Sequence, residues 1–254
     1  MADAFLNKVA LVTGGASGIG KAVAVALAAQ GAAVSVADLR KDAAQDVVEE
    51  ITGAGGTAVA VEVDVSDPAQ VKNAVDQTVS AFGKLDLALN NAGISGPTGL
   101  LGDYDDSDGF AAYKKLIGIN LDSVYFGMRY EIPAMLAAGG GAIVNTSSIL
   151  GVVGEPTATP YTTAKHGVAG MTKAAGAGYA AQGIRINSVH PGYIETPLLA
   201  NMDRDAYNGL VAKHPIGRLG TVEEVANMVL FLLSDTSTFI NGAQFVVDGG
   251  YTAV

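Results

Sequence analysis

The chain has 254 residues, 49% hydrophobic and 16% charged, which is the composition of a compact globular protein and argues against a disordered one. Its formal net charge of -10 opposes binding to nucleic acid or to an anionic membrane, because phosphate groups are neutralised by clustered Lys and Arg. The absence of cysteine excludes disulfides, thiolate metal sites and a cysteine nucleophile; it fits a reducing compartment, and we expect a cytoplasmic protein.

Short apolar runs alternate with helical patterns along the whole chain. The expected strands cover residues 8–13, 32–38, 57–64, 85–90, 142–147, 184–190 and 243–248. Helices are expected after each of the first five strands, ending near residues 30, 51, 82, 138 and 182, and further helices reach residue 233. Apolar strands separated by helices indicate an α/β fold with a parallel sheet that is covered on both faces. No linker divides residues 1–254, so we expect a single domain.

Neither a membrane partner nor a metal is expected. The first residues lack a basic start followed by an apolar stretch, so no secretory signal is visible. The longest charge-free stretch, 132–154, contains a proline and three consecutive glycines, which a membrane helix would not tolerate easily. The acidic, glycine-rich segment 95–109 is expected to be a solvated loop, because its carboxylates lack the spacing of a calcium loop. The histidines form no i, i+4 ligand pair and are expected to be packing or surface residues; they are His166, His190 and His214.

A glycine-rich turn, TGGASGIG (13–20), follows the first strand and opens the first helix. Glycines permit a tight turn close to a ligand, and the N–H groups at a helix start attract a pyrophosphate. The spacing differs from the common dinucleotide fingerprint, and residues 15–21 nearly match a nucleoside-triphosphatase loop. That loop needs Ser or Thr to bind magnesium where this chain has Ala22, so the turn favours a dinucleotide.

Asp38 ends the second strand, where a carboxylate can accept hydrogen bonds from an adenosine ribose. A 2′-phosphate would meet like charge there, which favours NAD over NADP. Arg40 lies two residues further on and keeps NADP open as an alternative. The other interpretation of Asp38 is a cap for the next helix.

Tyr161 and Lys165 stand at i and i+4 on an expected helix, so both side chains leave one face of it. An adjacent ammonium favours the phenolate and lowers the pKa of a tyrosine, which would make it a useful base. The same spacing also occurs in ordinary surface pairs. Ser148 favours a catalytic pair over a surface pair, because it ends the fifth strand, where open α/β sheets place the residues that contact a ligand.

Taken together and in this order, these motifs resemble the short-chain dehydrogenase/reductase family over essentially the full length of the chain. The matching stretches are TGGASGIG (13–20), DVSD (64–67), NNAG (90–93), YTTAK (161–165) and PGYIETP (191–197). The resemblance implies a single-domain Rossmann fold with a seven-stranded, doubly wound parallel sheet in the order 3-2-1-4-5-6-7, assembled as a homotetramer. It also implies a catalytic tetrad of Asn120, Ser148, Tyr161 and Lys165.

The resemblance further assigns the residues that bind cofactor and substrate. The implied cofactor contacts are Gly14, Ser17, Gly18, Ile19, Gly20, Asp38, Leu39, Asp64, Val65, Asn90, Ala92, Gly93, Tyr161, Lys165, Pro191, Gly192, Ile194 and Thr196. Asp64 and Thr196 could instead cap the helices that follow them. The implied substrate contacts are Ser148, Leu150, Tyr161, Tyr193 and Leu199, and the expected pocket also includes Ile94, Ile149, Val152, Val153, Leu198 and Met202.

The implied reaction is hydride transfer between NAD(H) and a secondary alcohol or ketone. Tyr161 would exchange the hydroxyl proton, Ser148 would hold the substrate oxygen, and Lys165 would lower the pKa of the tyrosine and bind the nicotinamide ribose. Asn120 would hold a water that relays protons to solvent. A mostly apolar pocket suits an uncharged substrate, and Glu155 with the nearby acidic loop argues against anionic ones.

Two other functions stay open. A 3-oxoacyl-[acyl-carrier-protein] reductase shares these motifs, although the acidity of the chain should hinder docking of an acidic carrier protein, and Asp38 opposes NADPH. A regulatory protein could bind NAD without turnover, which an intact tetrad argues against.

Overall fold

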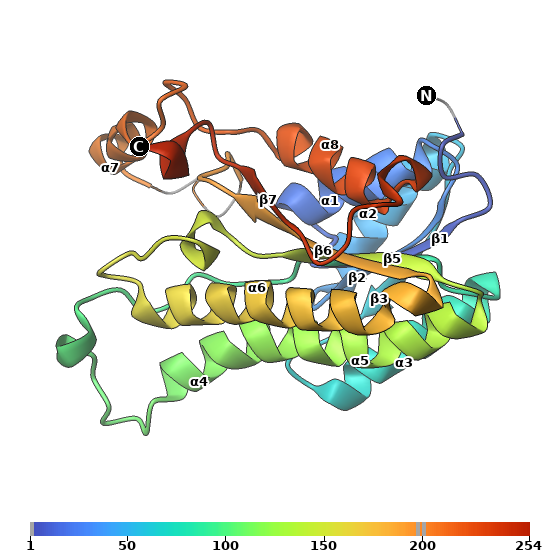
Figure 1. Ribbon diagram of the computed structural model, residues 1–254, viewed down its shortest axis with the longest axis horizontal. Coiled ribbons are helices and arrows are strands. Elements are labelled where there is room, and N and C mark those ends of the chain that lie inside the picture. The colour runs from blue at the N-terminus through green and yellow to red at the C-terminus, as the bar shows by residue number, and fades with distance from the viewer. Residues whose placement is uncertain (1–2, 197–198, 200–201) are drawn as a thin grey trace.

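A seven-stranded parallel sheet forms the centre of the molecule (Figure 1). The structure is a computed structural model and describes residues 3–196, 199 and 202–254. The strands are β1 (Val9–Thr13), β2 (Ala33–Asp38), β3 (Thr57–Glu62), β4 (Leu87–Asn90), β5 (Gly141–Thr146), β6 (Ile184–Pro191) and β7 (Gln244–Val247). Their order, β3-β2-β1-β4-β5-β6-β7, confirms the expected topology.

Helices cover both faces of this sheet (Figure 1). One face packs against α1 (Gly18–Ala28), α2 (Lys41–Gly53) and α8 (Val222–Leu233). The other packs against α3 (Pro68–Phe82), α5 (Ser123–Ala137) and α6 (Thr159–Tyr179). Because side chains alternate across a strand, Ala10 and Val12 of β1 belong to the first core and Leu11 to the second. The apolar runs of the five inner strands are therefore buried on both faces, whereas the edge strands β3 and β7 are only partly buried.

Two further helices, α4 (Ala111–Ile117) and α7 (Arg204–Ala212), lie toward one end of the molecule. At this end the strands β5 and β6 finish, and the connections to α4, α6 and α7 gather beside them (Figure 1). Ligand sites of open α/β sheets lie at the carboxyl ends of the strands, so this edge is where a site is sought. Within the described part of the chain, no helix is both long and apolar enough to cross a membrane.

The long helix expected to end near Ala138 differs from the prediction. It is divided into α4, a turn of π-helix at Gly118–Asp122, and α5. The fully buried Asn120 lies in the π turn. Single π turns occur frequently at functional sites; this one begins at Gly118, a residue that weakens a helix but does not by itself indicate a π turn.

Candidate active site

The glycine turn after β1 is packed so closely that side chains could not be added to it. Gly14 has φ +62°, and a Cβ there would lie 3.0 Å from the Cα of Ala92. A Cβ at Gly20 would collide with the carbonyl oxygen of Gly14. Ser17 precedes α1 in an extended conformation and makes no side-chain cap, while Ile19 packs against the core. The first N–H groups of α1 thus remain available for an anion, which fits the pyrophosphate of a dinucleotide.

Asn91 holds this turn in place, although the sequence analysis did not assign it a role. Its Nδ2 donates to the carbonyl oxygens of Thr13 (3.2 Å) and Gly14 (3.4 Å), and its backbone N–H donates to Thr13 Oγ1 (3.0 Å). Ala92 donates to the same hydroxyl over 3.3 Å. The motif 90–93 therefore joins the end of β4 to the turn after β1. The two lie side by side because β4 pairs with β1 in the sheet.

The side chain of Asn90 belongs to a buried hydrogen-bond network, and its assignment as a cofactor contact stays a prediction. It is buried, and its Nδ2 donates to Glu131 Oε2 and to Asn145 Oδ1, both over 3.0 Å. Asn145 Nδ2 in turn donates to Thr172 Oγ1 over 3.0 Å. These bonds direct the Asn90 amide into the layer between the sheet, α5 and α6 and not toward the edge, so any contact it makes with a cofactor would be through its backbone.

Asp38 lies at the end of β2 beside the glycine turn. Its Oδ2 accepts the N–H of Ala16 (3.1 Å), and its Oδ1 accepts the N–H of Arg40 (3.1 Å). The helix α2 has no side-chain cap, so capping is not the role of this carboxylate. Leu39, 65% exposed, presents an apolar surface next to it. This arrangement leaves a carboxylate and an apolar side chain where an adenosine would lie beyond the pyrophosphate.

The alternative role of Asp64 as a helix cap does not agree with the structure, whereas the residues directly after Thr196 lie outside the described part of the chain. Asp67 caps α3 by accepting the N–H of Ala69, whereas Asp64 accepts the N–H (2.9 Å) and hydroxyl of Ser66. The helix α7 is capped by Asp203, and the Thr196 side chain lies beside Gly18, 3.5 Å from the place of a Cβ there. The segment after β6 therefore approaches the glycine turn.

Other assigned cofactor residues line the same edge. Val65 and Ile194 are buried, and Ile194 bridges to Gly220. Gly192 follows Pro191 at the end of β6 and donates its N–H to the Val247 carbonyl over 2.9 Å. A Cβ at Gly93 would lie 3.4 Å from Asn120 Oδ1, so this glycine permits close approach of the buried amide.

The two adjacent serines after β5 have different surroundings. Ser147 is buried and donates to the carbonyl oxygen of Lys165 over 2.8 Å, which anchors the strand to α6. Ser148 Oγ accepts the N–H of Leu150 over 3.2 Å, so its own hydrogen remains available to donate. The structure thus separates a structural serine from one that can bind a substrate oxygen.

Tyr161 and Lys165 lie on the same face of α6, as the sequence predicted. Lys165 Nζ is 5.5 Å from the centre of the Tyr161 ring and donates to the carbonyl oxygen of Thr146 over 2.9 Å. Burial lowers the pKa of Lys165, only 3% exposed, to about 8. Burial also raises the pKa of Tyr161 to about 12, against the effect of a Ser148 hydrogen bond. In the protein alone burial therefore outweighs the Ser148 hydrogen bond, and the lowering of the tyrosine pKa by Lys165 stays a prediction.

Asn120 is more firmly bound than expected. Its Oδ1 accepts the N–H of Ile94 and its Nδ2 donates to the Ile94 carbonyl oxygen, both over 2.8 Å. The amide therefore fixes the chain directly after β4. One hydrogen of Nδ2 remains for a water, so the proton relay assigned to this residue stays a prediction.

Two histidines hold backbone groups of the site. His190 Nδ1 lies 2.9 Å from the Ser148 carbonyl oxygen and its Nε2 lies 2.8 Å from Ser188 Oγ. Burial lowers the pKa of His190 to about 4, so the ring is neutral at pH 7, and an Nδ1–H donating to Ser148 satisfies both bonds. His214 Nε2 accepts the Tyr193 N–H over 3.3 Å. No group of three or more potential metal ligands forms among the residues that the structure describes.

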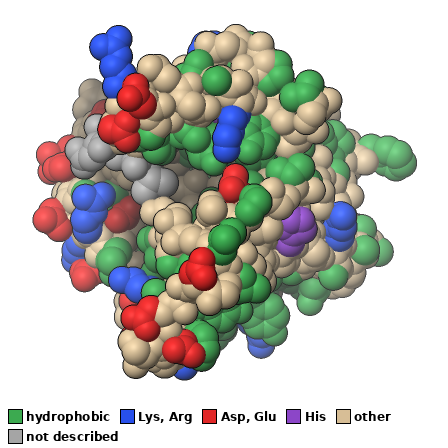
Figure 2. Space-filling model, turned by 90° about the vertical axis from the view of Figure 1, so that its left-hand side faces the viewer, with side chains coloured by type: hydrophobic (Ala, Val, Ile, Leu, Met, Phe, Trp, Pro, Cys, Tyr) green, Lys and Arg blue, Asp and Glu red, His purple; other side chains and the backbone are tan. Residues whose placement is uncertain are grey.

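Three segments around the catalytic residues form what we call the substrate mouth: 94–110, 149–158 and the described residues of 193–214. They lie at the end of the molecule that Figure 2 shows, where acidic and basic side chains surround a hollowed surface. Leu150 is buried, and Tyr193 and Leu199 are partly buried. Leu198, another expected pocket residue, lies outside the described residues.

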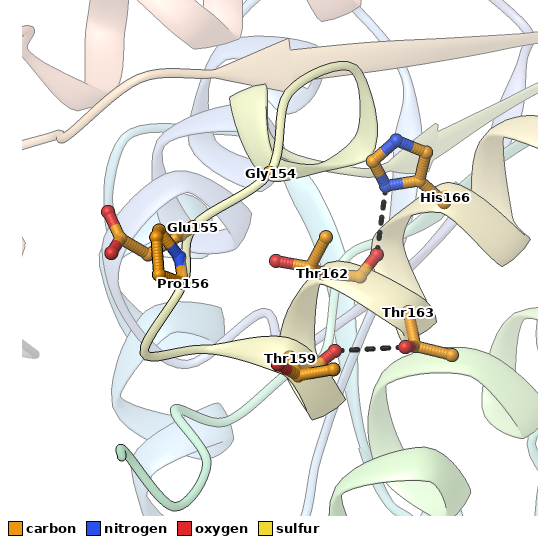
Figure 3. Close-up of a pocket in the computed structure, with 7 residues that line it drawn as sticks. All are labelled: Gly154, Glu155, Pro156, Thr159, Thr162, Thr163 and His166. Atoms are coloured by element: carbon orange, nitrogen blue, oxygen red, sulfur yellow. Dashed lines mark hydrogen bonds between the residues drawn. The ribbon is translucent and has the colours of Figure 1, made fainter. Parts of the chain in front are cut away.

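A separate hollow of about 660 Å³ lies between the 154–156 loop and the outer side of α6 (Figure 3). It is lined by Gly154, Glu155, Pro156, Thr159, Thr162, Thr163 and His166. Neither Tyr161 nor Lys165 belongs to it, since these two leave α6 on another face. The catalytic groups are therefore not part of this hollow.

Hydroxyl, phenol and ammonium groups that meet at the carboxyl edge of a Rossmann sheet can exchange a proton with an alcohol while hydride passes to a nicotinamide. Fold and site together thus define a nicotinamide-dependent oxidoreductase. A family model described as enoyl-(acyl carrier protein) reductase matches residues 14–252. The chain belongs to the short-chain dehydrogenase/reductase family.

Several similar proteins match over almost the whole chain. Cyclohexanol dehydrogenase of Acinetobacter sp. (strain SE19) is 51% identical and the match covers 100% of this chain and 98% of that protein. Cis-4-hydroxycyclohexanecarboxylate dehydrogenase of Sinomonas cyclohexanicum is 46% identical, with 100% of both covered. The 3-oxoacyl-[acyl-carrier-protein] reductase of Thermotoga maritima is 38% identical over 96% of this chain and 97% of its own. A crystal structure of a short-chain type dehydrogenase/reductase from Mycobacterium marinum has a TM-score of 0.92, 37% identity, and coverage of 98% and 97%.

Proposed function

We propose that this protein oxidises uncharged cyclic secondary alcohols of about the size of cyclohexanol to ketones, with NAD as the hydride acceptor. The observation that carries the proposal is the buried Lys165 ammonium, 5.5 Å from the Tyr161 ring on the same helix face, with Ser148 beside the phenol. The high similarity to a cyclohexanol dehydrogenase supports a six-membered ring alcohol. Apolar residues such as Leu150 near Ser148 are consistent with an uncharged ring.

In the proposed mechanism each residue has one task. Ser148 donates its hydrogen to the alcohol oxygen and positions it, while Tyr161 accepts the hydroxyl proton. When bound, the oxidised cofactor supplies a hydride acceptor and one positive charge near the phenol. That charge, added to the Lys165 ammonium, favours the phenolate and must offset the burial that raises the pKa of Tyr161 to about 12. Since oxidation needs the phenolate and reduction the phenol, oxidation rises with pH and reduction falls.

The cofactor preference is supported by Asp38. Its carboxylate lies at the end of β2 and already occupies the N–H groups of Ala16 and Arg40, which could otherwise bind a 2′-phosphate. We therefore propose NAD over NADP. The cysteine-free composition supports the further proposal of a cytoplasmic location.

We also propose a homotetramer. Large apolar side chains are exposed at the β7 edge and on two helices of the monomer: Val246 is 39% exposed, Phe231 on α8 is 40% exposed and Tyr125 on α5 is 58% exposed. Apolar groups gathered on an edge strand and on helix faces are typical of surfaces that a second copy covers. Light scattering coupled to size-exclusion chromatography measures the assembly.

The test is the formation of reduced nicotinamide, followed by absorbance, with cyclohexanol, linear secondary alcohols and 3-hydroxyacyl thioesters. We expect cyclohexanol with NAD to give the highest kcat/KM. Faster turnover of the acyl thioester would instead favour a carrier-protein reductase, which the family description and the 38% identical relative keep as the second candidate. NAD binding without turnover of any alcohol would favour a sensor.

A further inference from the structure

An ion pair joins two segments of the substrate mouth, the 149–158 loop between Ser148 and Tyr161 and the segment 193–214. Glu155 Oε2 lies 3.6 Å from the Nζ of Lys213, which directly follows α7. The Glu155 side chain is 21% exposed and the Lys213 side chain 49% exposed, so the carboxylate is the better shielded partner. Figure 3 shows the Glu155 carboxylate on the far side of the 154–156 loop from Thr163 and His166, at the edge of the hollow that it helps to line.

The third segment of the mouth is attached to the same loop through Thr157. The Thr157 hydroxyl donates to Glu155 Oε1 over 3.1 Å. Its carbonyl oxygen accepts the N–H of Gly99 (2.9 Å) and the hydroxyl of Tyr104 (3.2 Å). Glu155 therefore connects, directly or through one residue, all three segments that surround the catalytic groups.

Tyr193 lies beside the ion pair, because its ring is 5.9 Å from the ring of His214, the residue that follows Lys213. Burial, Tyr251 and Glu155, in that order of size, raise the pKa of Tyr193. Tyr193 in turn opposes ionisation of Tyr161, behind the larger effects of burial and Ser148. These directions are consistent with the placement of Glu155, Tyr193 and the reacting phenol around one mouth. An anionic substituent on a bound ring would enter the same neighbourhood.

We propose that the Glu155–Lys213 pair determines the charge that a substrate can carry, admitting uncharged ring alcohols and disfavouring ring alcohols that bear a carboxylate. This inference rests on the proposed function, oxidation of ring alcohols, and it specifies the substrate class further. In this ion pair Lys213 supplies the positive charge beside the loop between Ser148 and Tyr161. Glu155 already neutralises that charge. A substrate carboxylate would have to displace Glu155 and would then face its charge.

The relatives indicate that such a choice is made by side chains and not by the fold. Both a cyclohexanol dehydrogenase and a cis-4-hydroxycyclohexanecarboxylate dehydrogenase match the full length of this chain, and their names differ by one substituent on the ring. A further negative group stands close by, since Glu195 Oε1 accepts the hydroxyl of Tyr207 on α7. With a net charge of -10 on the whole chain, the field around the mouth also opposes an anion.

The experiment compares two probes that share the ring and differ in charge: cis-4-hydroxycyclohexanecarboxylate and its primary amide. The ratio of kcat/KM for the amide to kcat/KM for the carboxylate is measured with NAD for the wild type, Glu155→Gln and Lys213→Gln. Glu49→Gln, on an exposed position of α2, serves as the control because it changes the net charge equally. Calorimetric dissociation constants of both probes for the enzyme–NADH complex give the same comparison without turnover.

We expect the wild type to prefer the amide by about tenfold, on the order of the interaction between two partly screened charges in one site. Glu155→Gln should lower this ratio about fivefold, since Lys213 then has no carboxylate beside it, and Lys213→Gln should raise it by a similar factor. Glu49→Gln should leave it unchanged. Turnover of the amide and cyclohexanol serves as evidence that each variant is folded.

The inference is overturned if Glu155→Gln leaves the ratio at the wild-type value, or if Lys213→Gln moves it in the same direction as Glu155→Gln. Failure to oxidise cyclohexanol and the amide would contradict the proposed function and not this inference. In that case the ratio of the two dissociation constants, read across the same variants, decides whether the ion pair discriminates by charge.

Discussion

The cofactor side and the substrate mouth of this protein are built in different ways. Around the glycine turn the contacts are made to the backbone. Asn91 and Asp38 bind main-chain groups, and a Cβ at Gly20 would collide with the carbonyl oxygen of Gly14. Around the mouth backbone contacts are joined by contacts between two side chains, as in Glu155 with Lys213 and Tyr207 with Glu195.

This difference explains which side can vary. A backbone cradle without room for a Cβ admits one ligand geometry, and few substitutions there are tolerated sterically. Exposed ion pairs and hydrogen bonds contribute little stability individually, so they can be exchanged without loss of the fold. A protein with this division can keep one cofactor and change its substrate. The predictions below separate the two sides, beginning with the reacting group that lies between them.

Tyr161→Phe should abolish most turnover and leave cofactor binding nearly unchanged. The phenol exchanges the substrate proton, and loss of a general acid–base group lowers the rate by about a thousandfold or more. The ring and the Lys165 contact remain, so the NAD dissociation constant should change by less than about twofold. Steady-state kinetics and fluorescence titration of NADH measure the two effects. A variant that keeps substantial activity would remove Tyr161 from the mechanism.

Glu131→Gln should change how the stability of the cofactor side depends on pH. Burial raises the pKa of Glu131 from 4.5 to about 7, with the Asn90 hydrogen bond acting the other way. The folded protein then binds this proton more tightly than the unfolded chain, so the stabilisation is complete below pH 4.5 and is lost as the pH rises through about 7. The difference between the two pKa values corresponds to about 3 kcal/mol in the free energy of unfolding for this fully buried group.

Urea unfolding of both proteins at low and high pH measures this effect. Relative to Glu131→Gln, the wild type should lose stability between about pH 5 and pH 8, because the variant has no proton to release there. Other titrating groups are common to both proteins and cancel in the comparison. Parallel pH profiles would show that the Asn90 network does not hold a protonated carboxyl.

Asp38→Ala should shift the cofactor preference toward NADP. The substitution removes a negative charge and releases the N–H groups of Ala16 and Arg40, and the Arg40 guanidinium lies 3.9 Å from the present carboxylate. We expect the ratio of kcat/KM for NADP to that for NAD to rise about 30-fold, as for loss of one close like-charge contact. Kinetics with each cofactor on the same alcohol test this. An unchanged ratio would locate the adenosine ribose elsewhere.

The sequence predicted the strands from local patterns and the sheet order through the family resemblance, and it predicted that Tyr161 and Lys165 share one helix face. Apolar runs gave the strands, and glycine spacing and the i, i+4 pair gave the turn and the Tyr161–Lys165 face. It did not predict the Asn91 brace, the π turn around Asn120 or the buried Glu131. The Asn91 brace and Glu131 depend on partners more than twenty residues away, and the π turn has only Gly118 at its start, which does not distinguish a π turn from an ordinary helix.

The smallest expected effect tests the side-chain contacts of the mouth. Tyr207→Phe removes the hydrogen bond to Glu195 that holds α7 against the segment after β6, while the ring keeps its packing. Since one exposed hydrogen bond contributes little, KM for cyclohexanol should rise about threefold, with kcat and the NAD dissociation constant near their wild-type values. Steady-state kinetics at saturating NAD measures KM for cyclohexanol and kcat separately. A large loss of kcat, or weaker NAD binding, would mean that α7 supports the cofactor side as well, and the two sides would then not be independent.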